Sequence, residues 1–259
     1  MKNIGIIGVG IIASAVVEGF CTAENDEELH FFLCPRNKEK TAHLKSMFPD
    51  QITVCNTNQE AVDSSDVIFV SLLGKHAESA LKEMEFKQEQ MIISVMSDHP
   101  VSSLSEWIKP ARKLVRMVPL PLVTTHKGPI VCYPKDEAAA SLFAPLGEVI
   151  GLKDENELIV VTAITGLMST YYLMLHTVAR SAAEYGLSEE VSMNFTSLFF
   201  NALSDKAVTV GIDGAKALAY DEMTPGGLNE LALLSNVDNG TYENLKVSFE
   251  KIMERMLKK

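Results

Sequence analysis

A glycine turn near the start of the chain constrains the fold more than any other feature of the sequence. Residues 4–8 (IGIIG) form a strand-like apolar run, and residues 11–23 continue with helical periodicity. Between them the chain reads GVGIIA, a GxGxxA pattern over residues 8–13. In this setting the first glycine permits a tight turn, the second lets a ligand approach the main chain, and the small alanine lets helix and strand pack closely. The stretch therefore predicts a strand–turn–helix unit with free N–H groups at the start of the helix.

The alternation of strand and helix that begins at this turn continues through the first half of the chain. Helical patterns at residues 11–23, 36–48 and 75–85 separate short apolar runs. The predicted strands are residues 4–8, 30–34, 52–55, 66–72, 91–96, 113–118 and 129–133. Continuous apolar strands that alternate with helices are typical of a parallel sheet covered on both faces. We expect the last two strands, which the Pro-rich VPLPLV joins, to be less regular.

Strand signals stop after residue 153, and only helical patterns follow. These cover residues 156–185, 188–210, 227–236 and 241–257, separated by Gly- or Pro-containing breaks such as YGLS, GIDG and TPGG. The predicted fold class is therefore α/β. A Rossmann-like, mostly parallel sheet domain spans residues 1–153, and an all-helical domain spans residues 154–259.

Composition narrows the classes of partner. Hydrophobic residues make up 47% of the 259 residues and charged residues 22%, as is usual for a folded globular protein. A net charge of −11 disfavours nucleic acid and anionic membranes as partners, although a local basic patch can still bind a small anion. The cysteines form no CxxC pair and have no histidine at metal-ligand spacing, so we expect reduced thiols, a cytoplasmic location and no metal site.

One uncharged run, residues 158–179, is long enough to span a bilayer. It contains several Thr and Ser residues and a histidine, and it lacks a basic flank on either side. We therefore interpret it as a helix buried on most sides, within a bundle or at a subunit interface, rather than as a membrane span.

The end of the second strand indicates which dinucleotide the glycine turn binds. An Asp or Glu at that position would bind the ribose 2′-hydroxyl of NAD. This chain instead reads CPRNK over residues 34–38, with Arg36 just after the strand and no carboxylate at its end. Because a guanidinium suits a phosphate bidentately, NADP(H) is favoured over NAD(H).

Several stretches resemble the pyrroline-5-carboxylate reductase family over nearly the whole length. IGIIGVGIIASAVVEGF is similar to the family's FIGxGNMAxAIxxGL, DVIFVSLLGK to DVVxLAVKP, LVRMVPLPLV to xVRxMPNTPxxV, AITGLMSTYYLM to AVTGLSGSGPAY, and MTPGGLNE to TSPGGTT. The resemblance implies a Rossmann domain followed by a helical domain that interlocks two subunits. Together with the glycine turn, it gives the cofactor-binding candidates Gly8, Gly10, Ile11, Ile12, Ala13, Cys34, Arg36, Asn37, Asn56, Ser71, Leu72 and Leu73.

The substrate-side motifs depart from the family pattern. AVKP becomes SLLG, the asparagine of MPNTP becomes Leu120, and the two threonines of PGGTT become Leu228 and Asn229. The resemblance implies that helical-domain loops hold a substrate carboxylate. The candidates there are Thr224 and Asn229 as catalytic residues, and Ser169, Thr170, Tyr171, Pro225, Gly226, Gly227 and Leu228 as substrate-binding residues. The N–H groups of the helix that the TPGG turn opens are expected to be available for a carboxylate.

The expected reaction is hydride transfer to a small cyclic imine such as 1-pyrroline-5-carboxylate, giving an amino acid such as proline. A cationic C=N⁺ acceptor needs no proton donor in the hydride step, and residues 165–180 contain no lysine for that role. Two alternatives stay open. One is another NADP-dependent dehydrogenase for a keto or hydroxy acid, with His99, His126, His176 or a tyrosine as the acid. The other is a nucleotide-binding regulator that has lost catalysis.

Overall fold

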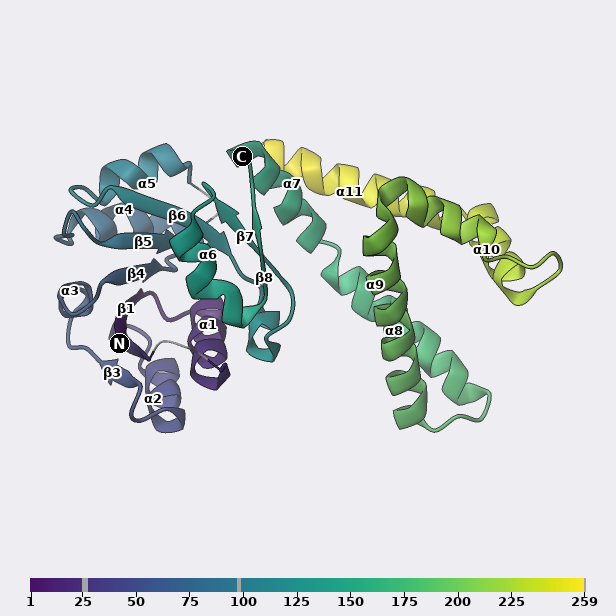
Figure 1. Cartoon of the computed structure of the whole chain (residues 1–259), viewed down its shortest axis with the longest axis horizontal. Coiled ribbons are helices and arrows are strands. Elements are labelled where there is room, and N and C mark those ends of the chain that lie inside the picture. Colours follow the sequence, from purple (N-terminus) through teal and green to yellow (C-terminus); the bar gives the residue numbers. More distant parts are fainter. Residues whose placement is uncertain (25–27, 97–98, 259) are drawn as a thin grey trace. The chain divides into compact units, whose positions relative to one another are not determined.

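The computed structural model describes residues 1–24, 28–96 and 99–258. It divides into two compact units, Met1–Leu158 and Ile159–Lys259, which are described separately below (Figure 1). The first unit contains the sheet and its covering helices, and the second is entirely helical. The predicted fold class, a mostly parallel sheet domain followed by an all-helical region, is confirmed.

The first unit is built on an eight-stranded sheet in the order β3-β2-β1-β4-β5-β6-β7-β8. All neighbouring pairs are parallel except β6 and β7, which are antiparallel. The strands are β1 (Lys2–Ile7), β2 (Leu29–Leu33), β3 (Ile52–Val54), β4 (Val67–Val70), β5 (Met91–Ser94), β6 (Lys113–Val118), β7 (Pro129–Tyr133) and β8 (Glu148–Gly151). The antiparallel pair flanks the Pro-rich connection, where less regular strands were expected, and the change of direction itself was not predicted. The edge strand β8 was not predicted.

Helices cover both faces of this sheet (Figure 1). The chain leaves β1 toward β3 on one side and leaves β4 toward β6 on the other, so right-handed crossovers place the two sets of helices on opposite faces. The helices are α1 (Ile11–Thr22), α2 (Lys38–Met47), α3 (Asn58–Asp63), α4 (Gly74–Lys82), α5 (Val101–Trp107) and α6 (Glu137–Phe143), with 3₁₀ turns η1 (Pro121–Thr125) and η2 (Ala144–Leu146). The short helices α3, α5 and α6 were not predicted.

The core of the first unit lies between α1 and the central strands. Phe20 of α1 meets Phe143 edge-to-face, with ring centroids 5.2 Å apart, and both rings are buried together with Phe31 and Phe69. Burial of such aromatic side chains contributes about 2 kcal/mol each, so this cluster anchors α1 to the sheet. The helix that opens at the glycine turn therefore has a fixed position.

A buried arginine fixes the first turn of α7 (Glu155–Thr165) to the sheet. Arg116 of β6 is 2% exposed, and its Nη1 donates to Oε1 of Glu155 at 2.9 Å, while its Nη2 donates to the main-chain oxygen of His99. The same Glu155 oxygen accepts the N–H of Val101 at 3.0 Å. Because a buried charge needs partners, this network holds α7 against β6 and the start of α5.

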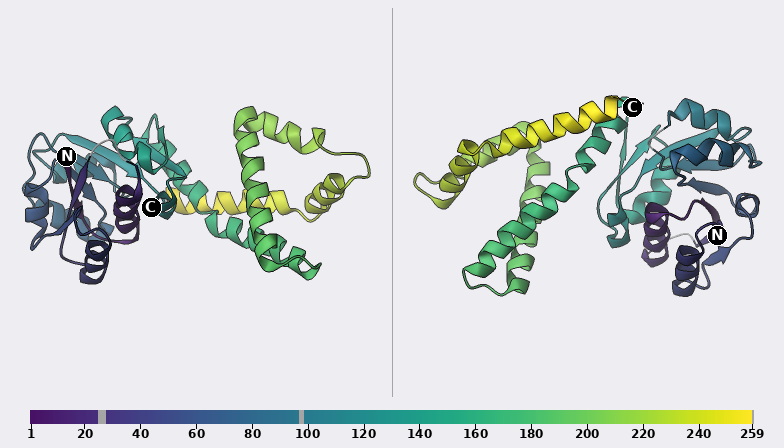
Figure 2. Two further views of the ribbon diagram at one scale, coloured as in Figure 1. Left: turned by 60° about the horizontal axis from the view of Figure 1, so that its bottom comes forward. Right: turned by 180° about the vertical axis from the view of Figure 1, so that it is seen from behind.

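The second unit continues with α8 (Met168–Glu184), α9 (Glu189–Asp221), α10 (Leu228–Asp238) and α11 (Thr241–Leu257). Helices α8 and α9 lie side by side (Figure 2). The expected break at GIDG is a kink within α9, where Gly211 has φ +71° and the helix then resumes to Asp221.

Residues 158–179 lie on two helices, since α7 ends at Thr165 and α8 begins at Met168, and their burial in a bundle or at a subunit interface stays a prediction. Gly166, within the break, lies against α11: a Cβ there would be 2.9 Å from Cδ1 of Ile252. Only Leu175 and Ala179 of α8 are buried. By length and composition, the stretch Glu155–Glu184 is the one candidate membrane span among the described residues, and core helices of soluble proteins pass the same test.

Candidate functional site

A crevice opens at the carboxyl ends of β1, β2 and β4. The strand order reverses between β1 and β4, and ligands of open α/β sheets bind at such a switch point. The crevice has a volume of about 590 Å³. Its lining residues are Gly8, Val9, Gly10, Arg36, Asn37, Lys38, Ser71, Leu72 and Leu73. Seven of the predicted cofactor-binding residues are thus brought together in one place.

Gly8 and Gly10, the two glycines of the turn, have different structural roles. Gly8 has φ +95°, and a Cβ there would lie 2.2 Å from the carbonyl oxygen of Ser71, so glycine is required for both backbone conformation and space. Gly10 has an extended backbone (φ −94°, ψ −165°), and a Cβ there would meet nothing within 4 Å. The absent side chain of Gly10 therefore leaves room for a ligand beside the main chain.

Helix α1 starts at this open space without a side-chain cap and without an acidic residue in its first turn. Its first N–H groups and the positive end of its dipole face an anion without competition from a carboxylate of the helix itself. Ile11 is 69% exposed, whereas Ile12 is half-buried and Ala13 is fully buried. Ala13 thus acts through helix–strand packing, and the main chain supplies the ligand-facing groups.

The segment after β2 supports the turn and carries two cations into the crevice. The Gly8 N–H donates to Sγ of buried Cys34 at 3.1 Å, and Nδ2 of Asn37 donates to the main-chain oxygen of Val9 at 3.1 Å. Asn37 also caps α2 by accepting the N–H of Lys40. Arg36 and Lys38 line the crevice, and neither forms an ion pair with a described residue. Cys34 and Asn37 therefore hold the loop, and the two cations are available to a phosphate.

Asn56 lies outside the set of residues that line the crevice. Its main-chain N–H and its Nδ2 both donate to Oε2 of Glu60, at 2.7 and 3.1 Å. In this arrangement Asn56 closes the loop before α3 and has a carboxylate as its immediate neighbour. Its predicted part in cofactor binding stays a prediction.

The substrate-side candidates lie on two segments of the helical unit. Ser169, Thr170 and Tyr171 occupy the first turn of α8 and are exposed. Residues 224–227 form the turn between α9 and α10, closed by the Gly227 N–H donating to the Thr224 carbonyl oxygen at 2.7 Å. Leu228 follows with 85% of its side chain exposed. In the helical unit taken by itself, Ser169, Thr170, Tyr171 and Leu228 are therefore exposed.

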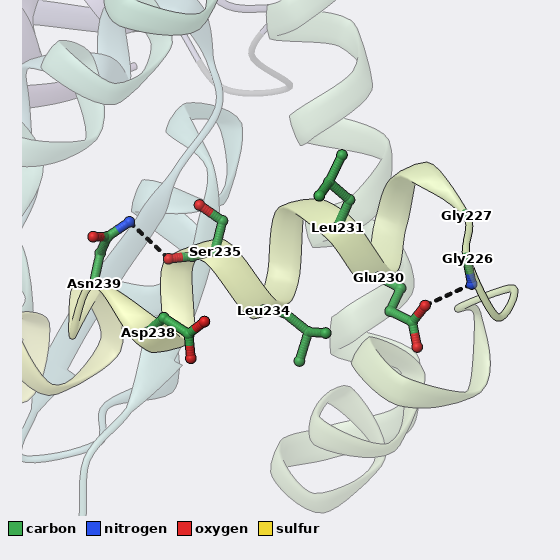
Figure 3. Close-up of a pocket in the computed structure, with 8 residues that line it drawn as sticks. All are labelled: Gly226, Gly227, Glu230, Leu231, Leu234, Ser235, Asp238 and Asn239. Carbon is green, nitrogen blue, oxygen red and sulfur yellow. Dashed lines mark hydrogen bonds between the residues drawn. The ribbon is translucent and has the colours of Figure 1, made fainter.

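The two glycines of the TPGG turn use their own N–H groups within the chain, and the expectation that the N–H groups at the start of α10 bind a carboxylate stays a prediction. A groove of about 540 Å³ runs along α10 from this turn, and Figure 3 shows the residues that line it. The Gly226 N–H donates to Oε2 of Glu230 at 2.6 Å, and the Gly227 N–H is used within the turn. Asn229, expected to meet the substrate, donates from Nδ2 to the main-chain oxygen of Glu222 at 3.2 Å.

The three histidines kept as alternative acids lie in separate places. Nε2 of His99 lies 3.0 Å from the Gly74 carbonyl oxygen, and its ring packs edge-to-face on Trp107. Nε2 of His126 lies 3.0 Å from the Gly19 carbonyl oxygen. His176 is exposed on α8. None of the three lines the crevice or the α10 groove.

The cysteines are free thiols, and three of them are buried. Burial raises the pKa of Cys21 to about 12 and, with the Glu60 carboxylate adding to it, the pKa of Cys55 to about 11. A thiol with such a pKa is a poor nucleophile at neutral pH. Among the described residues, no group of three or more His, Cys, Asp or Glu side chains is placed to hold a metal ion.

Comparisons with known proteins agree with this geometry. Residues 3–98 match the family described as NADP oxidoreductase coenzyme F420-dependent. Pyrroline-5-carboxylate reductase of Pseudomonas aeruginosa is 25% identical over 265 residues, covering 98% of this chain and 93% of that protein. The chain is a distant homologue of the pyrroline-5-carboxylate reductases. The resemblance inferred from the sequence motifs is thereby confirmed.

Solved structures show that the fold of this reductase superfamily extends over the whole chain. The pyrroline carboxylate reductase of Plasmodium falciparum with NADP bound has a TM-score of 0.81 at 19% identity, covering 98% of this chain and 97% of that one. An imine reductase from Pseudomonas sp. has a TM-score of 0.60 at 13% identity, covering 98% and 92%. The family match over residues 3–98 and the curated relatives, rather than these structures, identify the chain as an NADP-dependent oxidoreductase of the pyrroline-5-carboxylate reductase superfamily.

Sequence reasoning missed two lining residues of the crevice and the glutamate that contacts the TPGG turn. Val9 and Lys38 line the crevice although only their neighbours were predicted. Lys38 was detectable as a second cation two residues after Arg36. Glu230 was also missed, although a Glu three residues after a helix N-cap is a known capping signal.

Proposed function

We propose that this chain is a cytoplasmic NADPH-dependent reductase of small cyclic imines of the 1-pyrroline type. The names of its relatives suggest 1-pyrroline-5-carboxylate, whose reduction gives proline. The observation that carries the proposal is the crevice at the start of α1, with open main chain at Gly10 and two cations after β2.

The residues of the crevice fit NADPH. The pyrophosphate would lie against the N–H groups at the start of α1, where the missing side chain of Gly10 leaves space. Arg36 and Lys38 would hold the 2′-phosphate, because a phosphate in this position needs cations and the end of β2 carries no carboxylate. Bound there, NADPH would supply the hydride.

An iminium acceptor suits this crevice better than a ketone. Hydride transfer to C=N⁺ gives a neutral amine, whereas transfer to C=O gives an alkoxide that needs a proton donor. Among the residues that the structure describes, the crevice is lined by no His, Asp, Glu, Cys or Tyr, and Ser71 supplies the one hydroxyl there. Ser71, Leu72 and Leu73 would therefore act by positioning the reactants and excluding water. A keto-acid dehydrogenase would need an acid from elsewhere in the chain.

We further propose that the helical unit pairs with a second copy. Its helices expose large apolar side chains with no covering partner in the chain: Phe195 and Phe199 of α9 are 65% and 50% exposed, and α10 and α11 have no buried residue. Apolar surface of this extent marks a protein interface. The same interface would cover the uncharged part of α8, up to Ala179, in which only Leu175 and Ala179 are buried.

The test is NADPH oxidation, followed at 340 nm, with a panel of 1-pyrroline, 1-pyrroline-5-carboxylate, and 2- and 3-keto acids. The proposal predicts that at least one cyclic imine is reduced faster than every keto acid. Faster reduction of a keto acid would favour the dehydrogenase alternative. NADPH binding without turnover of any acceptor would favour the regulator, and no binding would overturn all three.

A further inference from the structure

The side chain of His99 contacts the segment that forms one wall of the cofactor crevice. Its Nε2 lies 3.0 Å from the carbonyl oxygen of Gly74, the first residue of α4. Because a carbonyl oxygen only accepts hydrogen bonds, Nε2 carries the proton and donates it. Gly74 directly follows Ser71, Leu72 and Leu73, which line the crevice. The hydrogen bond therefore joins His99 to the end of this wall.

The two ends of the wall are held by different contacts. At its start, the Ser71 N–H donates to the main chain of β1 at 2.8 Å, and Leu72 packs against the core. At its other end, Leu73 is 74% exposed. Among the described residues, His99 makes the one side-chain hydrogen bond to residues 71–74. The position of the exposed end of the wall therefore depends on His99.

His99 is itself fixed by two contacts. Its ring packs edge-to-face on Trp107 of α5, with ring centroids 4.9 Å apart, and Trp107 packs against the core of the sheet unit. The main-chain oxygen of His99 accepts a hydrogen bond from Nη2 of Arg116, whose side chain is 2% exposed. A side chain that its neighbours hold in this way can fix the position of the group that it contacts.

The strand order indicates which part of the cofactor this wall would meet. In the proposed function, Arg36 and Lys38 after β2 hold the 2′-phosphate, and the turn after β1 holds the pyrophosphate. Strand β4 lies on the other side of β1 from β2. A dinucleotide that extends across the ends of these strands would therefore have its nicotinamide half beside residues 71–73.

From these contacts we propose that His99 is a positioning residue, which holds the wall at residues 71–73 in place for the nicotinamide half of NADPH. It acts through the Gly74 carbonyl group rather than by touching the cofactor. The inference rests on the cofactor site of the proposed function. The competing explanation is that His99 only stabilises the fold, in which case its loss would lower the unfolding temperature and leave the affinity for the cofactor unchanged.

Two substitutions of His99 separate the hydrogen bond from the ring contact. H99F keeps a ring for Trp107 and removes the donor, whereas H99Q keeps an N–H donor and removes the ring. His126 offers a matched control, because its Nε2 also lies 3.0 Å from a glycine carbonyl oxygen, that of Gly19, in a contact that is likewise partly buried. Gly19 lies in the last turn of α1, at the opposite end of this helix from the crevice. H126F therefore removes an equivalent hydrogen bond away from the cofactor site.

The experiment is calorimetric titration of wild type, H99F, H99Q and H126F with two ligands, NADPH and adenosine 2′,5′-bisphosphate. The second ligand carries the 2′-phosphate and has no nicotinamide. Thermal unfolding of each protein checks its folding. We expect H99F to raise the Kd for NADPH at least about fivefold and to leave the Kd for the bisphosphate within about twofold. H99Q should restore the Kd for NADPH to within about twofold of wild type, and H126F should change neither constant.

The outcomes separate this inference from the function on which it rests. An unchanged Kd for NADPH in H99F, an equal rise for both ligands, or an H99Q or H126F that binds NADPH as weakly as H99F would overturn the positioning role. Should H99F fail to fold, H99A carries the same prediction. A wild type that binds no NADPH defeats the cofactor site and this inference with it. A wild type that binds NADPH and reduces no imine defeats the proposed reaction alone, because the role of His99 is decided by the binding constants.

Discussion

A Cβ atom on Gly8 would lie 2.2 Å from the carbonyl oxygen of Ser71, which is far inside van der Waals contact. This closeness joins the turn after β1 to the end of β4 and forms the floor of the cofactor crevice. The two strand ends therefore depend on a glycine at position 8 for their packing as well as for the backbone conformation.

Gly8→Ala should destabilise the sheet unit. The variant combines a backbone at φ +95° with a clash against main chain, so we expect the free energy of unfolding to fall by about 2–4 kcal/mol in urea titrations. Gly186→Ala is the matched control, because Gly186 has φ +107° with nothing within 4 Å of a Cβ; its cost should be about 1 kcal/mol. Equal losses of unfolding free energy in Gly8→Ala and Gly186→Ala would contradict the clash with Ser71.

Arg36→Ala should weaken NADPH binding selectively. Loss of charge-assisted contacts to the 2′-phosphate raises the Kd for NADPH about 10- to 100-fold and leaves the Kd for NADH within about twofold. Fluorescence titration of both cofactors measures the two constants. Arg112→Ala removes an exposed arginine at the amino end of β6, away from the crevice, and serves as the control. An equal rise in the Kd for NADH would contradict a role of Arg36 in recognising the 2′-phosphate.

Alkaline pH should destabilise the fold in part through Cys21. Burial raises the pKa of this thiol from 9.0 to about 12, so the folded state holds the proton more tightly than the unfolded state. The stabilisation is fully present below pH 9.0 and is lost as the pH rises toward 12. Cys21→Ala should therefore show a shallower fall in unfolding free energy between pH 9 and 11 than the wild type. The pKa of Cys55 is raised only to about 11, so Cys55→Ala should alter the pH dependence of the unfolding free energy less than Cys21→Ala does. Identical pH profiles for wild type and Cys21→Ala would refute this account.

Phe195→Glu should dissociate the proposed dimer. Phe195 and Phe199 stack on the exposed side of α9, with ring centroids 6.2 Å apart, and a buried charge in their place would cost several kcal/mol at an interface. Light scattering after size exclusion should give twice the chain mass for the wild type and the single-chain mass for the variant. Asn194→Glu adds the same charge at the preceding polar position and should stay dimeric. A monomeric wild type would contradict the pairing.

The sequence was sufficient for the elements with strong periodicity and for the glycine turn. Strands β6 and β7 match their predicted ranges: β7 is an apolar run that begins at Pro129, and β6 is mostly apolar and ends before Pro119. The four-residue β8, which begins at Glu148, carries too little pattern to be recognised. Helices α3, α5 and α6 have six or seven residues, and two turns do not establish a period of 3.6.

The parts of the site that the main chain supplies could be predicted from the sequence. The parts that depend on where a side chain points could be predicted less well. The spacing of the glycines and the position of Arg36 predict the crevice from the sequence alone. Whether the Gly226 N–H is free depends on the rotamer of Glu230, which local spacing suggests but does not determine. Gly166, in the break of the uncharged run, packs against Ile252, a residue far along the chain. A local sequence pattern cannot predict tertiary contacts of this kind.

The most direct test of the account is calorimetric titration of NADPH into the wild type and Gly10→Val. The extended backbone at Gly10 accepts any residue and a Cβ there meets nothing, so the variant should unfold at the wild-type temperature. Its side chain fills the space meant for the pyrophosphate, so the wild type should bind NADPH and Gly10→Val should bind it at least about tenfold more weakly. Equal affinity in both proteins, or no binding heat from the wild type, would contradict the cofactor site on which everything else here is built.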